Sequence, residues 1–165
     1  MDLNCILPLP YPEINVERKN RKNATILLQL LYGANGELST VADYTYQSVI
    51  LKDMYPKMSD VLDCVSITEL NHFKILASAV FMLGAPRYSH DKNNTSYRFK
   101  NKYAYVNDNS DPQELLKENI FNEKKSISLY KHAYKEINDK YVKAIINRII
   151  IDEEHHIDLF SSLVK

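Results

Sequence analysis

Four segments of this 165-residue chain place an apolar or aromatic residue at every third or fourth position, and each interrupts that pattern near its middle with a glutamate. The spacing predicts four amphipathic helices that share one core. We expect these helices at about residues 22–55, 58–83, 112–137 and 140–163. The interrupting residues are Glu37, Glu69, Glu123 and Glu153, and His72 and His156 follow the second and fourth of them on the same stripes.

Breaks between the segments support these limits. Pro8, Pro10 and Pro12 make residues 1–21 an extended N-terminal arm, because proline removes a helix hydrogen bond. Pro56 ends the first helix, and the dipeptide Asp111-Pro112 is typical of a helix start. Residues 85–111 show no helical period and form a long connection.

The order of helices and connections predicts the topology. Two short turns make each flanking pair of helices antiparallel, and the long connection can run the length of the bundle. One long crossover, here between the second and third helices, marks one class of four-helix bundle. With only three glycines, the chain fits a single all-α domain over residues 1–165 better than a β-rich fold.

The glutamates on the core stripes need compensation. A buried carboxylate without a partner costs several kcal/mol even after the protein relaxes. Two divalent cations would balance four carboxylates, and neutral imidazoles would add nitrogen ligands. Carboxylate and imidazole together suit iron, manganese or zinc. We therefore expect a two-metal site whose ligands are Glu37, Glu69, His72, Glu123, Glu153 and His156.

The two halves of the chain also repeat each other. Residues 67–72 (Ile-Thr-Glu-Leu-Asn-His) match residues 151–156 (Ile-Asp-Glu-Glu-His-His), and Tyr44 and Tyr130 each lie seven positions after the first glutamate of their half. Such self-similarity indicates a duplicated helix pair. Two helical hairpins related by a pseudo-two-fold axis would bring both half-sites to one centre.

A buried network of glutamate and histidine without metal is the alternative to this site. It lacks cations, because no lysine or arginine lies on the four stripes. His155 points about 100° away from His156 on an ideal helix, so His156 is the expected ligand. Tyr44 and Tyr130 are expected as core aromatics whose hydroxyls could bond ligand carboxylates. Asp152 is either a partner of a ligand imidazole or a surface residue.

The order of these ligands resembles the ferritin-like superfamily, and within it rubrerythrin-type and manganese-catalase-like proteins. Residues 36–40 (Gly-Glu-Leu-Ser-Thr), 67–72 and 151–156 carry the likeness, which extends over about residues 22–164. It implies two metal ions, manganese or iron, bridged by Glu69 and Glu153, with Glu37 and Glu123 as terminal ligands. In manganese catalases the glutamate of the fourth helix need not bind metal directly.

The same resemblance implies two-electron redox chemistry on hydrogen peroxide or dioxygen, of catalase or peroxidase type, and identifies no catalytic residue. The paired Cys-x-x-Cys motifs of a rubredoxin domain are absent from the sequence. Their absence favours disproportionation of peroxide, because that reaction needs no outside electron donor. The alternatives are a non-enzymatic metal-binding or structural protein and a metal-free helical interaction module.

Composition limits the partners. With 21 basic and 21 acidic residues, the chain has no net charge to attract nucleic acid or an anionic membrane. No apolar run reaches the roughly 18 residues of a membrane span. Cys5 and Cys64 are too few for a disulfide scaffold, and no signal peptide is visible, so reduced cysteines and a cytoplasmic location are expected. The tyrosine-rich connection favours a homodimer.

Overall fold

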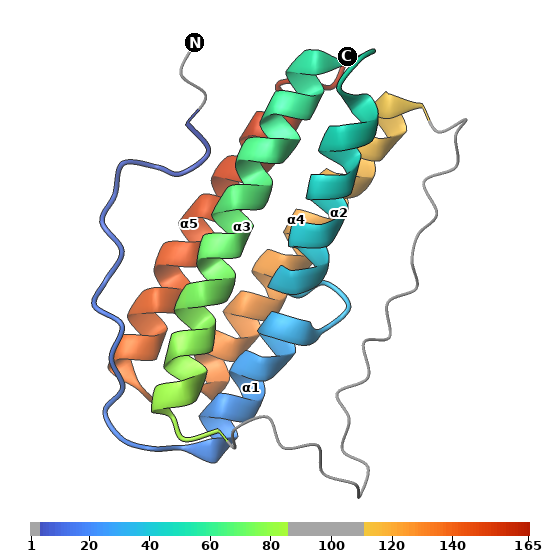
Figure 1. Ribbon diagram of the computed structural model, residues 1–165. Helices are drawn as coiled ribbons and strands as arrows, with labels where there is room; N and C mark the ends of the chain where they lie inside the picture. The colour runs from blue at the N-terminus through green and yellow to red at the C-terminus, as the bar shows by residue number, and fades with distance from the viewer. Residues whose placement is uncertain (1–3, 86–110) are drawn as a thin grey trace, which may run out of the picture.

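The computed structural model describes residues 4–85 and 111–165, and the regular structure in those ranges is helical. Five helices follow one another: α1 (Arg21–Tyr32), α2 (Glu37–Leu51), α3 (Pro56–Met82), α4 (Pro112–Glu136) and α5 (Lys140–Ser161). α1 and α2 lie end to end in the place of the expected first helix (Figure 1). The expected all-α four-helix bundle is confirmed. None of these helices combines the length and the apolar character needed to cross a bilayer.

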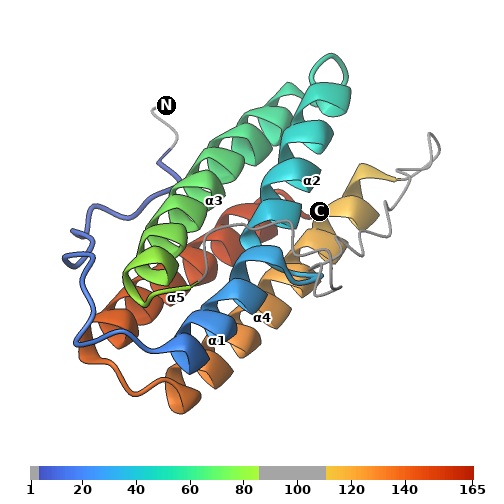
Figure 2. The ribbon, with the colours of Figure 1, turned by 60° about the horizontal axis from the view of Figure 1, so that its bottom comes forward.

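Short turns join α2 to α3 and α4 to α5, so the members of each pair run antiparallel and side by side (Figures 1 and 2). Asp111 caps α4, as predicted, by accepting a hydrogen bond of 2.9 Å from the backbone N–H of Gln113. The end of α3 and the start of α4 lie at opposite ends of the bundle (Figure 1). A long crossover suits this arrangement. The connection predicted at residues 85–111 lies outside the described residues, except for its first and last residue.

The predicted continuous helix over residues 22–55 is wrong in one respect, because it is interrupted at residues 33–36. A Cβ atom on Gly36 would lie 2.6 Å from the carbonyl oxygen of Leu30 and 2.8 Å from the nitrogen of Gly33. Only glycine allows the backbone to approach so closely. The turn makes Glu37 the first residue of α2, where the positive end of the helix dipole favours a carboxylate.

Two apolar clusters fill the bundle, one on each side of the level of the glutamates. Along α3, Leu62 and Val65 of one cluster precede Glu69, whereas Leu76 and Ala79 of the other cluster follow it. Two residues that the helical period places on the core stripe, Ala34 and Tyr55, are exposed. Ala34 lies in the turn between α1 and α2, and Tyr55 lies beyond the end of α2.

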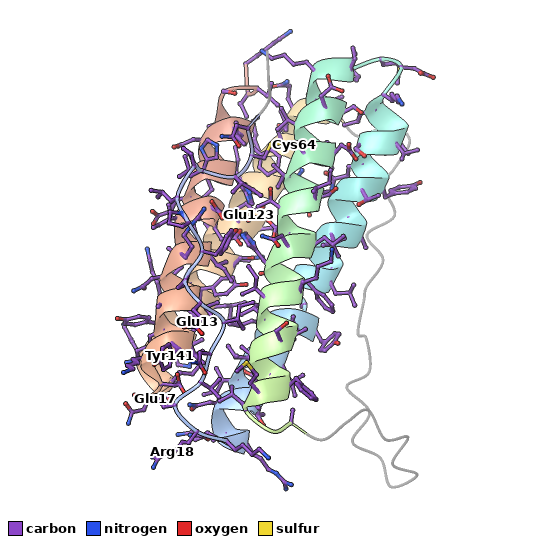
Figure 3. The ribbon with its side chains drawn as sticks, turned by 60° about the vertical axis from the view of Figure 1, so that its left-hand side comes forward. Glu13, Glu17, Arg18, Cys64, Glu123 and Tyr141 are labelled. Carbon is purple, nitrogen blue, oxygen red and sulfur yellow. A yellow bond between two sulfur atoms is a disulfide. The ribbon has the colours of Figure 1, made fainter. Side chains whose placement is uncertain are left out.

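The N-terminal arm runs along the seam between α3 and α5 (Figure 3). A disulfide between Cys5 and Cys64, with Cα atoms 5.9 Å apart, ties its start to α3. Near its end, the backbone N–H of Glu17 donates to Asp139 at 2.8 Å. The prediction of reduced cysteines is therefore wrong, because the arm folds back and joins residues 59 positions apart. Closing a loop of this length restricts the unfolded chain by about 4 kcal/mol in the chain-entropy account.

Replacing Gly36 with alanine tests the close approach in the turn between α1 and α2. The added Cβ would push the turn apart, and we expect the free energy of unfolding to fall by about 1–3 kcal/mol, measured by chemical denaturation. Ala34→Ser, at an exposed position of the same turn, is the control and should change stability by less than about 0.5 kcal/mol. A Gly36→Ala variant as stable as the parent would show that the turn does not require glycine.

Candidate metal centre

Six buried side chains from α2, α3, α4 and α5 meet inside the bundle. They are the residues predicted from the sequence, Glu37, Glu69, His72, Glu123, Glu153 and His156, and their exposed fractions are 0–4%. Figure 3 shows Glu123 in the interior, at mid-height of the helices. The three-residue spacing puts the glutamate and the histidine of each Glu-x-x-His motif on one helix face. The motifs of α3 and α5 therefore converge on the same level.

The six side chains form two overlapping groups. The first comprises Glu37, Glu69, His72 and Glu153, the second comprises Glu69, Glu123, Glu153 and His156, and the possible ligand atoms of each group lie within 4.8 Å of one another. Only Glu69 and Glu153 belong to both groups. A carboxylate that bridges two metal ions must reach both positions, so these two glutamates are the candidates for bridging and Glu37 and Glu123 for terminal ligation.

Each imidazole turns its Nδ1 atom toward the shared carboxylates. Nδ1 of His72 lies 3.3 Å from Glu69 Oε2 and 3.2 Å from Glu153 Oε1. Nδ1 of His156 lies 2.9 Å from Glu69 Oε1 and 3.7 Å from Glu153 Oε2. Nδ1 is therefore the candidate ligand atom in both residues. His155 points elsewhere and contacts a backbone carbonyl of the N-terminal arm at 3.0 Å.

Two tyrosine hydroxyls cross-link the unshared glutamates between α2 and α4. Tyr44 of α2 donates a hydrogen bond of 2.5 Å to Oε1 of Glu123 on α4. Tyr130 of α4 donates in the same way to Oε1 of Glu37 on α2. The reciprocal pairing follows the internal repeat of the sequence. It confirms the expectation that both tyrosines are core aromatics that bond carboxylates.

Burial and charge set the protonation of the centre without metal. Burial, together with neighbouring carboxylates, raises the pKa values of Glu37 and Glu123 well above their usual range. Burial alone would lower the pKa values of both imidazoles, but hydrogen bonds to carboxylates outweigh it. The pKa of His156 rises to about 9, and that of His72 rises well above its usual value. These shifts favour the protonated form of all four groups in the metal-free centre.

The shared glutamates show the opposite shift. Burial raises the pKa of Glu69, but hydrogen bonds from His156 and His72 outweigh it and hold the pKa below the usual value. In Glu153, burial and the charge of Glu69 raise the pKa, and the same two imidazoles again lower it. In the metal-free centre the shared carboxylates and the imidazoles therefore stabilise each other's charged forms.

Unsatisfied polar atoms show that these residues fit metal ions. Among the described residues, the buried atoms without a hydrogen-bond partner include Glu37 Oε2 and Glu123 Oε2, the carboxylate oxygens that the two tyrosines leave free. Buried polar atoms rarely lack a partner in native proteins. Divalent ions would satisfy them, and a set of carboxylates and imidazoles suits manganese and iron.

Residues behind His72 extend the centre. Asp152 is fully buried and its Oδ2 lies 3.3 Å from Nε2 of His72, which makes it a partner of the imidazole and not a surface residue. Arg148, which the sequence analysis missed, pairs with Asp152 at 2.6 Å. Opposite charges four residues apart on a helix were the signal for this pair. Tyr11 of the arm donates to Asp152, and no pattern in the arm pointed to it.

Metal affinity should depend steeply on pH. Binding by all six residues requires neutral imidazoles and ionised carboxylates, so it displaces protons from groups whose pKa values are raised in the metal-free centre. The imidazole of His156 stays protonated in the metal-free protein up to a pH of about 9, so protons compete with metal throughout the neutral range. We expect manganese affinity to rise at least about tenfold per pH unit between about pH 6 and pH 8, measured by calorimetry.

The control for this titration is His132→Gln, on the exposed side of α4. The variant should show the same dependence as the parent. An affinity that does not change over this pH range would show that the imidazoles are neutral before metal binds.

Comparison with known proteins identifies the family. The rubrerythrin family profile matches residues 29–164. A probable manganese catalase from Clostridium acetobutylicum is 28% identical, over 90% of this chain and 72% of that protein. Two crystal structures of KatB, a manganese catalase from Anabaena, have the same fold, with a TM-score of 0.73 and 20% identity over 94% of this chain and 77% of KatB. Since the family profile spans most of the chain and every residue of the candidate centre, the chain belongs to the rubrerythrin family.

Proposed function

We propose that this chain is a di-metal carboxylate protein that disproportionates hydrogen peroxide to dioxygen and water. The pair of ligand groups that share Glu69 and Glu153 carries the proposal. Each group supplies three carboxylates and one imidazole, and two divalent ions would balance the four glutamates. The proposed ligands are Glu37, Glu69, His72, Glu123, Glu153 and His156, and the proposed metal is manganese or iron.

A bound pair of such ions would exchange two electrons with peroxide, so that one molecule is oxidised to dioxygen and a second is reduced to water. The protein holds the ligands on separate helices and fixes the outer carboxylates. Tyr44 binds one oxygen of Glu123 and Tyr130 binds one oxygen of Glu37, which leaves the second oxygen of each glutamate for a metal. The apolar clusters on both sides exclude bulk water from this level.

Similarity to other proteins favours one metal and one substrate. Membership of the rubrerythrin family does not by itself choose between manganese and iron, or between peroxide and dioxygen. The Clostridium relative carries the name of a probable manganese catalase. This name favours manganese as the metal and peroxide as the substrate.

Burial of the centre favours a second candidate function, a non-enzymatic metal-binding or structural protein. The six candidate ligands are 0–4% exposed, and Tyr44 and Tyr130 cover the two outer carboxylates. A catalyst needs a coordination position that its substrate can reach. The second candidate predicts two bound metal ions per chain and negligible turnover.

We further propose that the chain forms a single ferritin-like domain and that two copies associate as a homodimer. Large apolar side chains are exposed on α2 and α3, among them Val49 at 67%, Ile67 at 60% and Phe81 at 68%. An interface between two copies of the chain would bury such side chains. Light scattering in solution should give twice the 19.2 kDa mass of the chain, and a monomer would contradict this part of the proposal.

We also propose the cytoplasmic location that the sequence predicts. The bond between Cys5 and Cys64 is an observation against it, because disulfides are rare in reducing compartments.

Oxygen evolution from hydrogen peroxide tests the proposed activity. Manganese-loaded protein should evolve oxygen, and elemental analysis should find two metal ions per chain. Glu69→Gln keeps the shape of a shared ligand but removes its charge, so metal content and turnover should fall at least about a hundredfold. Glu154→Gln changes an exposed neighbour of the centre and is the matched control. Two bound ions without oxygen evolution would favour the second candidate, and no bound metal would contradict both.

A further inference from the structure

The two halves of the centre repeat in sequence but differ in what lies beside each Glu-x-x-His motif. An offset of 84 residues, from 69 to 153, aligns the two motifs. The same offset pairs Thr68 with Asp152, and Cys64 with Arg148. These positions therefore hold an ion pair in the second half and uncharged residues in the first.

Asp152, Arg148 and Tyr11 form a hydrogen-bonded cluster behind His72. Nε2 of His72 lies 3.0 Å from the hydroxyl oxygen of Tyr11 and 3.3 Å from Oδ2 of Asp152. Tyr11 donates its own hydrogen to Asp152, so its oxygen can accept the Nε2 hydrogen. Arg148 holds Oδ1 of Asp152 at 2.6 Å and lies 4.4 Å from the centre of the Tyr11 ring. A hydrogen fixed on Nε2 leaves Nδ1 of His72 as the metal ligand.

His156 lacks this support. Its Nε2 is buried and, within the part of the chain that the structure describes, has no hydrogen-bond partner. Thr68, the counterpart of Asp152, instead donates its hydroxyl to the carbonyl oxygen of Cys64 at 3.3 Å. No carboxylate among the described residues therefore orients the outer side of this imidazole.

The N-terminal arm is bound by Cys64 and by Arg148, the two residues that the internal repeat aligns ahead of the Glu-x-x-His motifs. Cys64 of α3 bonds to Cys5 of the arm. Arg148 of α5 donates to the carbonyl oxygens of Leu7 and Leu9 at 3.0–3.1 Å. These contacts fix the backbone that leads to Tyr11 without using the Tyr11 hydroxyl. A Tyr11→Phe variant should therefore lose the hydroxyl and keep the arm in place.

We propose that Tyr11 is a positioning residue of the metal centre, which with Asp152 fixes the Nε2 hydrogen of His72 and makes the metal beside His72 more tightly held than the metal beside His156. The inference rests on the proposed di-metal centre and deepens it, because it makes the two metal positions inequivalent. Partners of a metal-binding histidine typically change metal affinity by about ten- to a hundredfold, and the described residues supply such partners to only one of the two.

Release of manganese from the fully loaded protein into excess EDTA tests this inference. The parent should release its ions in two kinetic phases. Tyr11→Phe should speed the slow phase about tenfold and leave the fast phase unchanged. Asp152→Asn should speed the same phase at least as much, because it contacts the same nitrogen. Tyr46→Phe, at a tyrosine of α2 that is 58% exposed, is the matched control and should release manganese as the parent does.

A single release phase in the parent would overturn the inference, and so would a slow phase that Tyr11→Phe leaves unchanged. Both results leave the peroxide activity standing. Equal acceleration of both phases, with a lower melting temperature of the metal-free Tyr11→Phe protein, would give the hydroxyl a purely structural role and also overturn it. A parent protein that binds no manganese would overturn the inference and the proposed function together.

Discussion

Four glutamates at one level of a helical core lose their hydration and repel one another, and the protein has to offset that cost internally. Without metal, the raised pKa values of Glu37 and Glu123 favour their neutral forms, and hydrogen bonds from His72 and His156 favour the charged forms of Glu69 and Glu153. Two divalent ions would bring four positive charges and balance the four carboxylates.

Several features of the surrounding structure stabilise the layer of the bundle that holds the four glutamates. Apolar clusters lie on both sides of it, so the fold gains its hydrophobic stabilisation away from the charged layer. The turn closed by Gly36 places Glu37 at the start of α2, where the helix dipole favours its ionised form. Tyr44 and Tyr130 each bind a carboxylate of the opposite half and thereby limit the movement of two helices relative to each other.

The N-terminal arm breaks the symmetry that the repeat would otherwise give the centre. It crosses from Cys64 on α3 to Arg148 on α5 and brings Tyr11 to one imidazole. A duplicated hairpin can supply two similar ligand groups, but a single arm can support only one of them. The arm also covers the α3/α5 side of the centre (Figure 3), so the burial that stabilises a metal pair also restricts the approach of a substrate.

The sequence alone determined the helices, their stripes and the six candidate ligands, because a 3.6-residue period reports which face of a helix is buried. Gly33 and Gly36 are a local signal for the turn before Glu37. The apolar period continues on both sides of them, however, so the pattern predicted one continuous helix. Only the tertiary structure joined Cys5 to Cys64, 59 residues apart, and Tyr11 to Asp152, 141 residues apart. The arm has no regular period, and its contacts are set by the seam between α3 and α5, which exists only after the bundle has formed.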